Sequence, residues 1–439
     1  MKTLFSQFQK QVKALGILLF FVILSTPAFA QHGMSANDRK EVVEGIAELI
    51  DSIYVFPDVA GRATDYLKEQ ERQGEYDEII DPNEFAQVLT EDLRSISHDL
   101  HLNVSYDPKA IAREKEKPAQ VDKGMGTIEM LKKENFGFKE VSILEGNVGY
   151  IDLRLFVTPE VGAETAVAAM NYLANTDAII FDLRNNRGGS PAMIQLILSY
   201  LYESEPVHIN NFYFRPTDEH TQTWTLPYVP GKRNPGVDVY VLTSQRSFSA
   251  AEEFSFDIKN LERGTLIGET TGGAANPGRT HTIDDRFTIF IPSGRAYSPV
   301  TGENWEGTGV EPHIEVPEED ALQVAHSHAL QQLKNKTENV ELQEYYDWHI
   351  NYFDAAQAPV ELSEEELTSL CGSYGPVKIE KKDDQLIYHK RGAKLKLIPI
   401  SKTEFYINDQ PRVRLKFSED RSELKEEYIP ANYRIYRRS

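Results

Sequence analysis

Hydrophobic residues recur at steps of three and four along the first part of the 439-residue chain, from Ser35 to about Ile96. This spacing is typical of amphipathic helices that bury one face against each other. Pro57 and Pro82 stand where a second and a third helix would begin, because proline fits the first turn of a helix. The pattern predicts an N-terminal helical bundle, which we assign to residues 31–107.

The segment 108–123 is charged, contains two prolines and has little hydrophobic pattern, so we expect an exposed linker there. The pattern then changes to short hydrophobic strands that alternate with helices, which favours a largely parallel sheet covered by helices. Catalytic groups in such folds lie where strands end and helices begin. We assign this core to residues 108–318. Its strands are expected at 148–153, 178–183, 237–242 and 265–268, and its helices at 160–175, 191–202 and 249–260.

A helical connector is expected at 319–360, and the pattern after it returns to strands. Short alternating segments about ten residues apart predict a small antiparallel β domain, a barrel or a sandwich, at 361–439. No site chemistry is visible in this last part. The predicted fold class is therefore α/β, with an N-terminal helical bundle and a small C-terminal antiparallel β domain.

The first thirty residues have the pattern of a secretory signal. Three lysines are followed by a hydrophobic run at 15–24 and by small residues at Ala28 and Ala30. The run is too short to cross a bilayer. We therefore expect residues 1–30 to be cleaved off after Ala30, which gives a secreted or periplasmic chain without an integral membrane segment.

Net charge and cysteine content exclude some classes of partner and site. Loss of the three signal lysines changes the formal net charge from −21 to −24, since the signal contains no acidic residue. A surface this acidic repels phosphate backbones, so nucleic acid is not an expected partner. Cys371 is the only cysteine, and it can form neither an internal disulfide nor a thiolate metal site. The oligomeric state is not indicated by the sequence.

Ser249 is the candidate nucleophile. Strand 237–242 leads toward it, and it stands at the start of a helix, where the dipole favours a developing negative charge beside the Ala250 amide. Ser249 and Glu252 together also have the pattern of a capping box, which starts a helix without any catalytic role. This motif alone leaves both interpretations open.

A second strand-to-helix turn contains Gly188-Gly189, after the strand at 178–183. A positive φ angle in a tight turn explains one glycine. Two adjacent residues without Cβ also leave their amides open to a substrate carbonyl, which is what an oxyanion hole requires. Either role is compatible with the pattern.

A serine nucleophile needs a base, and histidine or lysine usually provides it. His101, at the mouth of a predicted strand, is the first candidate, and His98, at a helix end, is its competitor. Glu306 could orient the imidazole, although an isolated glutamate in a chain with 68 acidic residues is a weak signal.

Four motifs follow one another in the chain: Asp182-Leu183-Arg184-Asn185 with Gly188-Gly189, Ser249-Ala250-Ala251-Glu252, Gly268-Glu269-Thr270-Thr271-Gly272-Gly273, and Gly307-Thr308-Gly309-Val310-Glu311-Pro312. Together they resemble the tail-specific, or C-terminal processing, serine peptidase family, over about residues 85–317. The resemblance implies a ClpP/crotonase-like core that acts on a peptide or protein substrate. It implies no metal and no organic cofactor.

Within this family the chain is similar to the branch of tricorn protease and of the interphotoreceptor retinoid-binding protein repeats. Bacterial tail-specific proteases carry a lysine base in the glycine-rich turn where this chain has Ala274, and no lysine occurs from Thr265 to Glu311. There is also no obvious PDZ insertion. The branch implies these roles: Ser249 as nucleophile, His101 as base, Glu306 as its support, and Ala250 with Gly188 or Gly189 as oxyanion hole.

We therefore predict a secreted serine peptidase that acts through an acyl-enzyme. The alternative is a non-catalytic protein that binds hydrophobic ligands of the retinoid or fatty-acid kind on the same fold, as the same branch implies. The presence of both Ser249 and His101 favours the peptidase. The peptide substrate and the role of the C-terminal β domain are not indicated.

Overall fold

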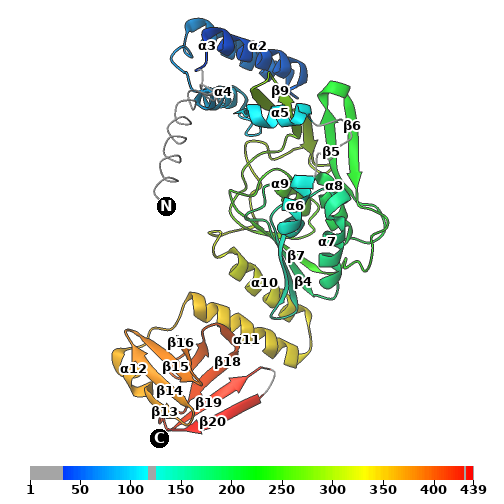
Figure 1. Cartoon of the computed structure of the whole chain (residues 1–439). Helices are drawn as coiled ribbons and strands as arrows, with labels where there is room; N and C mark the ends of the chain where they lie inside the picture. Colours follow the sequence, from blue (N-terminus) through cyan, green and yellow to red (C-terminus); the bar gives the residue numbers. More distant parts are fainter. Residues whose placement is uncertain (1–32, 117–124, 430–431, 439) are drawn as a thin grey trace, which may run out of the picture.

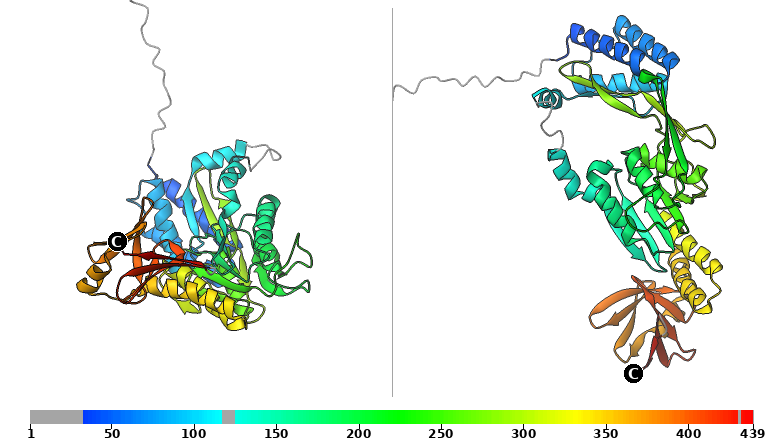
Figure 2. Two further views of the ribbon diagram at one scale, coloured as in Figure 1. Left: turned by 90° about the horizontal axis from the view of Figure 1, so that it is seen from below. Right: turned by 90° about the vertical axis from the view of Figure 1, so that its right-hand side faces the viewer.

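The computed structural model describes residues 33–116, 125–429 and 432–438, and the predicted signal segment lies outside them. The chain forms three parts in a row, with the N-terminal helices at one end, the α/β core in the middle and a β domain at the other end (Figures 1 and 2). Among the described residues, no helix is both long enough and apolar enough to span a membrane.

The N-terminal part, which we call the helical lobe, contains three packed helices and three strands. The helices are α2 (Ala36–Ile53), α3 (Pro57–Gln73) and α4 (Pro82–Ser97). Strand β1 (Asn103–Tyr106) pairs antiparallel with β10 (Phe287–Pro292), which pairs in turn with β9 (Gly278–Thr282). A segment far along the sequence thus completes this lobe, and side chains of β10 are buried in the same hydrophobic cluster as those of the helices.

The prediction of an exposed linker at 108–123 is wrong for the first half of that segment, which forms helix α5 (Pro108–Glu116). Helix α6 (Met125–Lys133) follows. The Asp107 side chain accepts the Ala110 amide at 2.9 Å, so an aspartate caps a helix whose first residue is proline. The charged residues of α5 are good helix formers, but they leave no hydrophobic periodicity from which the helix could be predicted. A short 3-10 helix, η1 (Asn135–Gly137), then leads into the core.

The core is a six-stranded sheet in the order β12-β8-β7-β4-β3-β2. All neighbours are parallel except β2 and β3, which are antiparallel. The predicted fold class is confirmed, and the four predicted strands lie within one residue of their expected ends. The strands are β2 (Phe138–Leu144), β3 (Val148–Leu153), β4 (Ala178–Asp182), β7 (Asp238–Thr243), β8 (Thr265–Gly268) and β12 (Ile314–Glu315).

Alternate residues of these strands pack into different clusters on the two faces of the sheet. Ile151, Phe181 and Val241, which lie side by side in register, are buried with α7 (Pro159–Tyr172), α8 (Pro191–Ser199) and α9 (Ala250–Asn260). Tyr150, Ile180 and Tyr240 are buried instead with α10 (Ala321–Lys336) and α11 (Val340–Gln357).

A further three-stranded sheet links the core to the helical lobe. It contains β11 (Gly294–Tyr297), β5 (His208–Phe214) and β6 (Glu219–Trp224), in that order. In the 3-10 helix η2 (Arg215–Thr217) between β5 and β6, the Arg215 guanidinium donates to the carbonyl oxygens of Tyr54 at 2.6 Å and Asp51 at 2.9 Å. The tip of this sheet is thereby bonded to the end of α2.

The C-terminal domain is an antiparallel meander of eight strands preceded by α12 (Glu364–Leu370). A bridge between Tyr374 of the first strand and Arg438, just after the last, brings the two ends of the meander together, so the sheet is nearly a closed barrel. Trp348 of α11 attaches it to the core, because its indole donates to the Pro411 carbonyl at 2.7 Å. The strands are β13 (Gly372–Tyr374), β14 (Val377–Lys382), β15 (Gln385–Lys390), β16 (Ala393–Pro399), β17 (Glu404–Ile407), β18 (Gln410–Phe417), β19 (Glu423–Tyr428) and β20 (Asn432–Arg437).

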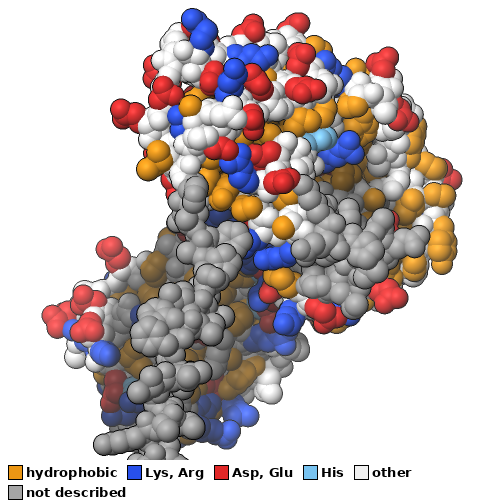
Figure 3. All heavy atoms as spheres, turned by 45° about the horizontal axis from the view of Figure 1, so that its top comes forward, with side chains coloured by type: hydrophobic (Ala, Val, Ile, Leu, Met, Phe, Trp, Pro, Cys, Tyr) orange, Lys and Arg blue, Asp and Glu red, His pale blue; other side chains and the backbone are white. Residues whose placement is uncertain are grey.

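Acidic and basic side chains are interspersed over the helical lobe in the space-filling view (Figure 3). Two carboxyl groups, by contrast, lie inside the core. Glu253 and Asp257 are one turn apart on α9 and are 5% and 2% exposed. Glu253 accepts one hydrogen bond, from the Asn210 amide at 3.0 Å. Burial raises the pKa of Glu253 to about 7, and burial together with Glu253 raises the pKa of Asp257 as well.

Replacing Glu253 by glutamine should therefore flatten the pH dependence of stability. The pKa of Glu253 is higher in the folded than in the unfolded chain, so its contribution is complete below about pH 4.5 and is lost as the pH rises through 7. We expect the free energy of unfolding of Glu253→Gln to equal that of the parent chain near pH 4.5. Near pH 8 it should exceed that of the parent chain by about 3 kcal/mol. Urea unfolding at both pH values measures this, and equal effects at the two pH values would contradict it.

Candidate active site

Ser249 occupies a strained turn between β7 and α9. Its backbone has φ 55° and ψ −118°, whereas an ordinary helix N-cap is extended. A residue with a side chain rarely adopts a positive φ, and such strain is found where a turn must present a side chain. A sharp strand-to-helix turn presents the nucleophilic serine of α/β-hydrolases. The capping-box interpretation alone does not account for this conformation.

The Glu252 carboxylate connects this turn to the loop at 271–274. It is fully buried and accepts the Ser249 amide at 2.8 Å, as a capping box requires. It also accepts the Thr271 hydroxyl at 2.6 Å and the amides of Gly273 at 2.6 Å and Ala274 at 2.9 Å. The glycine-rich turn, which contains Ala274, is therefore bonded to the Ser249 turn.

Gly188 and Gly189 lie beside the Ser249 turn. A Cβ atom on Gly188 would be 2.8 Å from the Ser249 Cβ and 3.0 Å from the Ala250 nitrogen, so only glycine allows this approach. The Gly188 amide donates to the Asn186 Oδ1 at 2.8 Å and is therefore occupied. Gly189 pairs with Phe156 in a parallel bridge, in which the Phe156 amide donates to the Gly188 carbonyl and the Ser190 amide donates to the Phe156 carbonyl. The Gly189 amide therefore points away from Phe156. The amides of Gly189 and Ala250 are the better oxyanion donors.

His101 reaches the same region from the helical lobe, in the short connection between α4 and β1. Arg94 holds this connection by donating to the carbonyl oxygens of Leu100 at 2.7 Å and Leu102 at 2.8 Å. The imidazole lies 5.1 Å from the ring of Phe248, the residue before Ser249, measured between ring centroids. The structure thus brings a histidine of one lobe next to the nucleophile turn of the other.

The His101 imidazole is neutral near pH 7. Its side chain is 11% exposed, and burial, with a smaller effect of Arg94, lowers its pKa to about 4. A neutral imidazole can accept a proton, as a general base must. Its Nδ1 atom is buried and has no hydrogen-bond partner among the described residues.

His98, the competing candidate, is exposed and ends α4 with a left-handed backbone at φ 57°. The two histidines are close in the sequence, but among them only His101 is packed against Phe248. A left-handed residue commonly ends a helix, so the positive φ of His98 accounts for its position without a catalytic role.

Glu306 lies close to His101. One carboxylate oxygen accepts the amides of Ala275 at 2.6 Å and Asn276 at 3.1 Å, and the other, Oε1, is buried without a partner. Ligand atoms of Glu306, His101 and Asp99 all lie within 4.8 Å of one another. Burial, with a further contribution from Asp99, raises the pKa of Glu306 to about 8.

Asp99 is a site residue that the sequence analysis missed. It is 1% exposed, and its Oδ1 accepts the His101 amide at 3.0 Å and lies 3.9 Å from the His101 Nδ1. Its Oδ2 accepts the Tyr54 hydroxyl at 3.1 Å and the Asn276 side-chain amide at 3.2 Å. Asp99 therefore joins the helical lobe, the His101 turn and the core. The only signal in the sequence is an acid two residues before the histidine.

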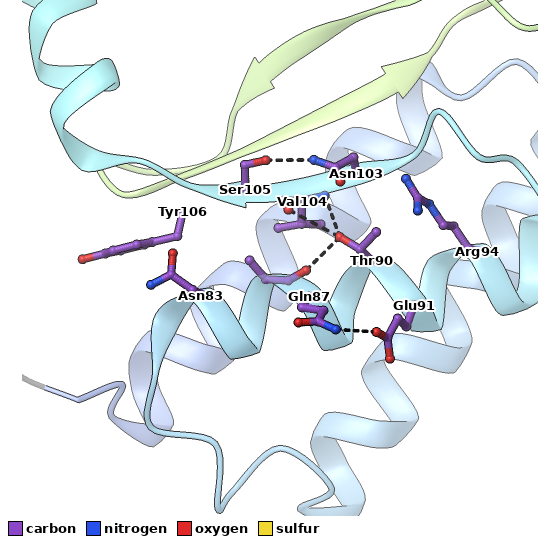
Figure 4. Close-up of a pocket in the computed structure, with 10 residues that line it drawn as sticks. Asn83, Gln87, Thr90, Glu91, Arg94, Asn103, Val104, Ser105 and Tyr106 are labelled. Atoms are coloured by element: carbon purple, nitrogen blue, oxygen red, sulfur yellow. Dashed lines mark hydrogen bonds between the residues drawn. The ribbon is translucent and has the colours of Figure 1, made fainter. Parts of the chain in front are cut away.

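A hollow of about 510 Å³ lies on another side of the connection, between α4 and β1 (Figure 4). The Thr90 hydroxyl accepts the Val104 amide at 2.9 Å, and Gln87 and Glu91 are bonded to each other at 2.8 Å. No histidine, serine nucleophile or glycine pair lines it. The hydrogen bond of Thr90 holds β1 against α4, and neither Ser249 nor His101 lines the hollow.

Comparisons with known proteins match the chain in two adjoining stretches. Residues 147–316 match the model of peptidase family S41, and residues 36–144 match that of the N-terminal domain of peptidase S41 in eukaryotic IRBP. Similar solved structures include a lipoprotein from Streptococcus agalactiae, with 14% identity over 67% of this chain and 96% of that one and a TM-score of 0.44. A putative peptidase from Parabacteroides merdae has 20% identity over 66% and 96%, with a TM-score of 0.46.

Tricorn protease is also similar, with 13% identity over 72% of this chain and 37% of its own, and a TM-score of 0.41. The two family matches follow each other directly and together span more than half of the chain. They include the Ser249 turn, the glycine pair, His101 and Glu306. The expectation of a serine-type peptidase is confirmed, and the chain belongs to peptidase family S41.

Proposed function

We propose that the chain hydrolyses peptide bonds with Ser249 as nucleophile and His101 as general base. The observation that carries this proposal is the contact between the His101 ring and Phe248, directly before a serine whose φ angle is 55°. Neither packing nor helix capping requires both features. A base and a hydroxyl at a helix start are what acyl transfer requires.

The reaction proceeds in two halves. His101 takes the Ser249 hydroxyl proton as the oxygen attacks the peptide carbonyl, and the amides of Gly189 and Ala250 stabilise the negative oxygen that forms. The protonated imidazole then gives its proton to the departing amine, which leaves an ester on Ser249. Water, deprotonated by the same imidazole, cleaves this ester and restores the serine.

Glu306 and Asp99 support the imidazole from its other side. Both carboxyl groups lie near His101, and their remaining oxygens are fixed by the Asn276 backbone and side chain. A carboxyl group there orients the ring, and in its ionised form it stabilises the imidazolium that forms during attack. Asp99 fixes the backbone of the histidine, and Glu306 has the free oxygen that can turn toward Nδ1.

We also propose that the mature enzyme is exported. The proposal is supported by the basic residues, the hydrophobic run and the cleavage pattern of the first thirty residues. A peptidase without disulfides can work in a periplasm or outside the cell, and the substrate would be a protein or peptide there.

An active-site-directed fluorophosphonate should label the chain at Ser249. We expect no labelling of Ser249→Ala and a loss of at least about 10³-fold in labelling rate for His101→Asn, because the serine then has no base. His98→Asn, which keeps a left-handed backbone position, should react like the parent chain. Labelling that persists in Ser249→Ala, or that is lost in His98→Asn and kept in His101→Asn, would contradict the assignment. A carrier of hydrophobic ligands would show no label at all.

Gly188→Ala should lower kcat/KM on a peptide by at least about 10³-fold, because its Cβ would displace the Ser249 turn. Gly302→Ala is the matched control. Gly302 has a similar positive φ of 73°, but no atom lies within 4 Å of the added Cβ. It should cost about 1 kcal/mol of stability and leave kcat/KM within a factor of two. Equal losses of activity in the two variants would refute the close approach of Gly188.

The exported protein should begin at Gln31. Mass spectrometry of the chain recovered from the periplasm or the medium gives this end directly, and Ala30→Leu should block the cleavage, since the site needs a small residue. A chain that keeps residues 1–30 and stays inside the cell would overturn the proposed export.

A further inference from the structure

Three potential metal ligands meet within the candidate active site. Asp99, His101 and Glu306 each offer one nitrogen or oxygen atom, and these atoms lie within 4.8 Å of one another. The Nδ1 of His101 is 3.9 Å from the Oδ1 of Asp99. In a tetrahedral zinc site with bonds of about 2.1 Å, ligand atoms are roughly 3.4 Å apart, so small side-chain rotations would close this set around an ion.

Two of these side chains have unused ligand atoms. The Nδ1 of His101 and the Oε1 of Glu306 are buried and have no hydrogen-bond partner among the described residues. Buried polar atoms are normally satisfied, so each of the two atoms needs an explanation. They come from different lobes of the chain, yet they belong to one group of neighbouring side chains.

The charge of the group also favours a cation. Within the described part of the chain, no lysine or arginine forms an ion pair with Asp99 or Glu306. Arg94 is nearby, but its guanidinium donates to the carbonyl oxygens of Leu100 and Leu102. Two buried carboxyl groups without a counter-ion are costly when both are ionised, and a divalent ion removes that cost.

The second oxygen of each carboxylate is already held in place. Tyr54 and Asn276 donate to Asp99 Oδ2, and the amides of Ala275 and Asn276 donate to Glu306 Oε2. Such outer hydrogen bonds orient ligands in known metal sites and raise their affinity. Hydrogen bonds to the second oxygen therefore hold both carboxyl groups in place, while the Oε1 of Glu306 remains free to bind an ion.

We propose that Asp99, His101 and Glu306 form an inhibitory binding site for a divalent transition-metal ion, of which zinc is the best fit. One imidazole and two carboxylates with room for water as a fourth ligand make a set that zinc accepts. The imidazole disfavours magnesium and calcium, which prefer oxygen ligands. Carboxyl groups that carry a proton release it to solvent when the ion binds.

Inhibition follows from the tautomer of the histidine. An ion on Nδ1 occupies the lone pair of that nitrogen, so the proton of the neutral ring must be on Nε2. A ring protonated on Nε2 cannot accept the proton of Ser249. Metal binding and general-base catalysis therefore exclude each other. This inhibitory consequence rests on the proposed function, whereas the binding itself does not.

Cobalt(II) titration of the full-length Ser249→Ala chain tests the binding. We expect one equivalent of Co²⁺ to give visible d–d absorption, to be displaced by Zn²⁺ and to be unaffected by Mg²⁺. His101→Asn, Glu306→Gln and Asp99→Asn, each added to Ser249→Ala, should weaken binding at least about tenfold, since even the loss of an outer hydrogen-bond partner costs this much. His98→Asn is the matched control and should leave the affinity unchanged.

The proposal is overturned if no stoichiometric Co²⁺ site is found, or if His101→Asn and Glu306→Gln bind as tightly as the parent. If circular dichroism shows that Asp99→Asn does not fold, the Co²⁺ affinity of Glu306→Gln decides the test. In a second experiment on the active chain, Zn²⁺ should abolish the fluorophosphonate labelling and a chelator should restore it. Cobalt binding without any labelling would instead refute the peptidase and leave the metal site standing.

Discussion

The geometry of the candidate site depends on one buried carboxylate, that of Glu252. It accepts four hydrogen bonds, from the amide of Ser249 and from three groups between Thr271 and Ala274. Hydrogen bonds to a charged acceptor are stronger than neutral ones, and each donor would be left unsatisfied without it. The loop that it fixes continues directly into the two amides that hold Glu306. A single side chain thus determines where both the serine and the supporting acid stand.

The second constraint is the exchange of segments between the two lobes. Strands β9 and β10 follow the glycine-rich loop at 271–274 in sequence, but β10 pairs with β1 of the helical lobe and β9 pairs with β10. Side chains of β10 share the hydrophobic cluster of that lobe. Asp99 then bonds across the boundary to Asn276, which directly precedes this crossing segment. The lobe that carries His101 is therefore held to the core by a sheet, by a hydrophobic cluster and by a buried polar network.

Local patterns predicted the parallel strands and the C-terminal β domain well, because buried strands are continuous hydrophobic runs and barrel strands alternate. The sheets of β5, β6 and β11 and of β1, β9 and β10 were not predicted, since their partners are distant in sequence. Ser249, His101 and the glycine pair were proposed as site residues from turns and motifs. Asp99 was missed because one acid among 68 has no distinctive pattern. The φ angle of Ser249 and the engagement of the Gly188 amide by Asn186 arise only from tertiary structure.

The division of the site between separately packed clusters has a further consequence. Ser249 directly precedes Ala250 and Ala251 of the hydrophobic cluster of the core, whereas His101 belongs to the helical lobe, whose interior is a different cluster. A core expressed alone would lose not only the histidine but also the strand that covers one side of β10. The complete candidate site consequently requires both lobes together, and a change in how rigidly the lobes are joined alters the site while every side chain in it stays the same.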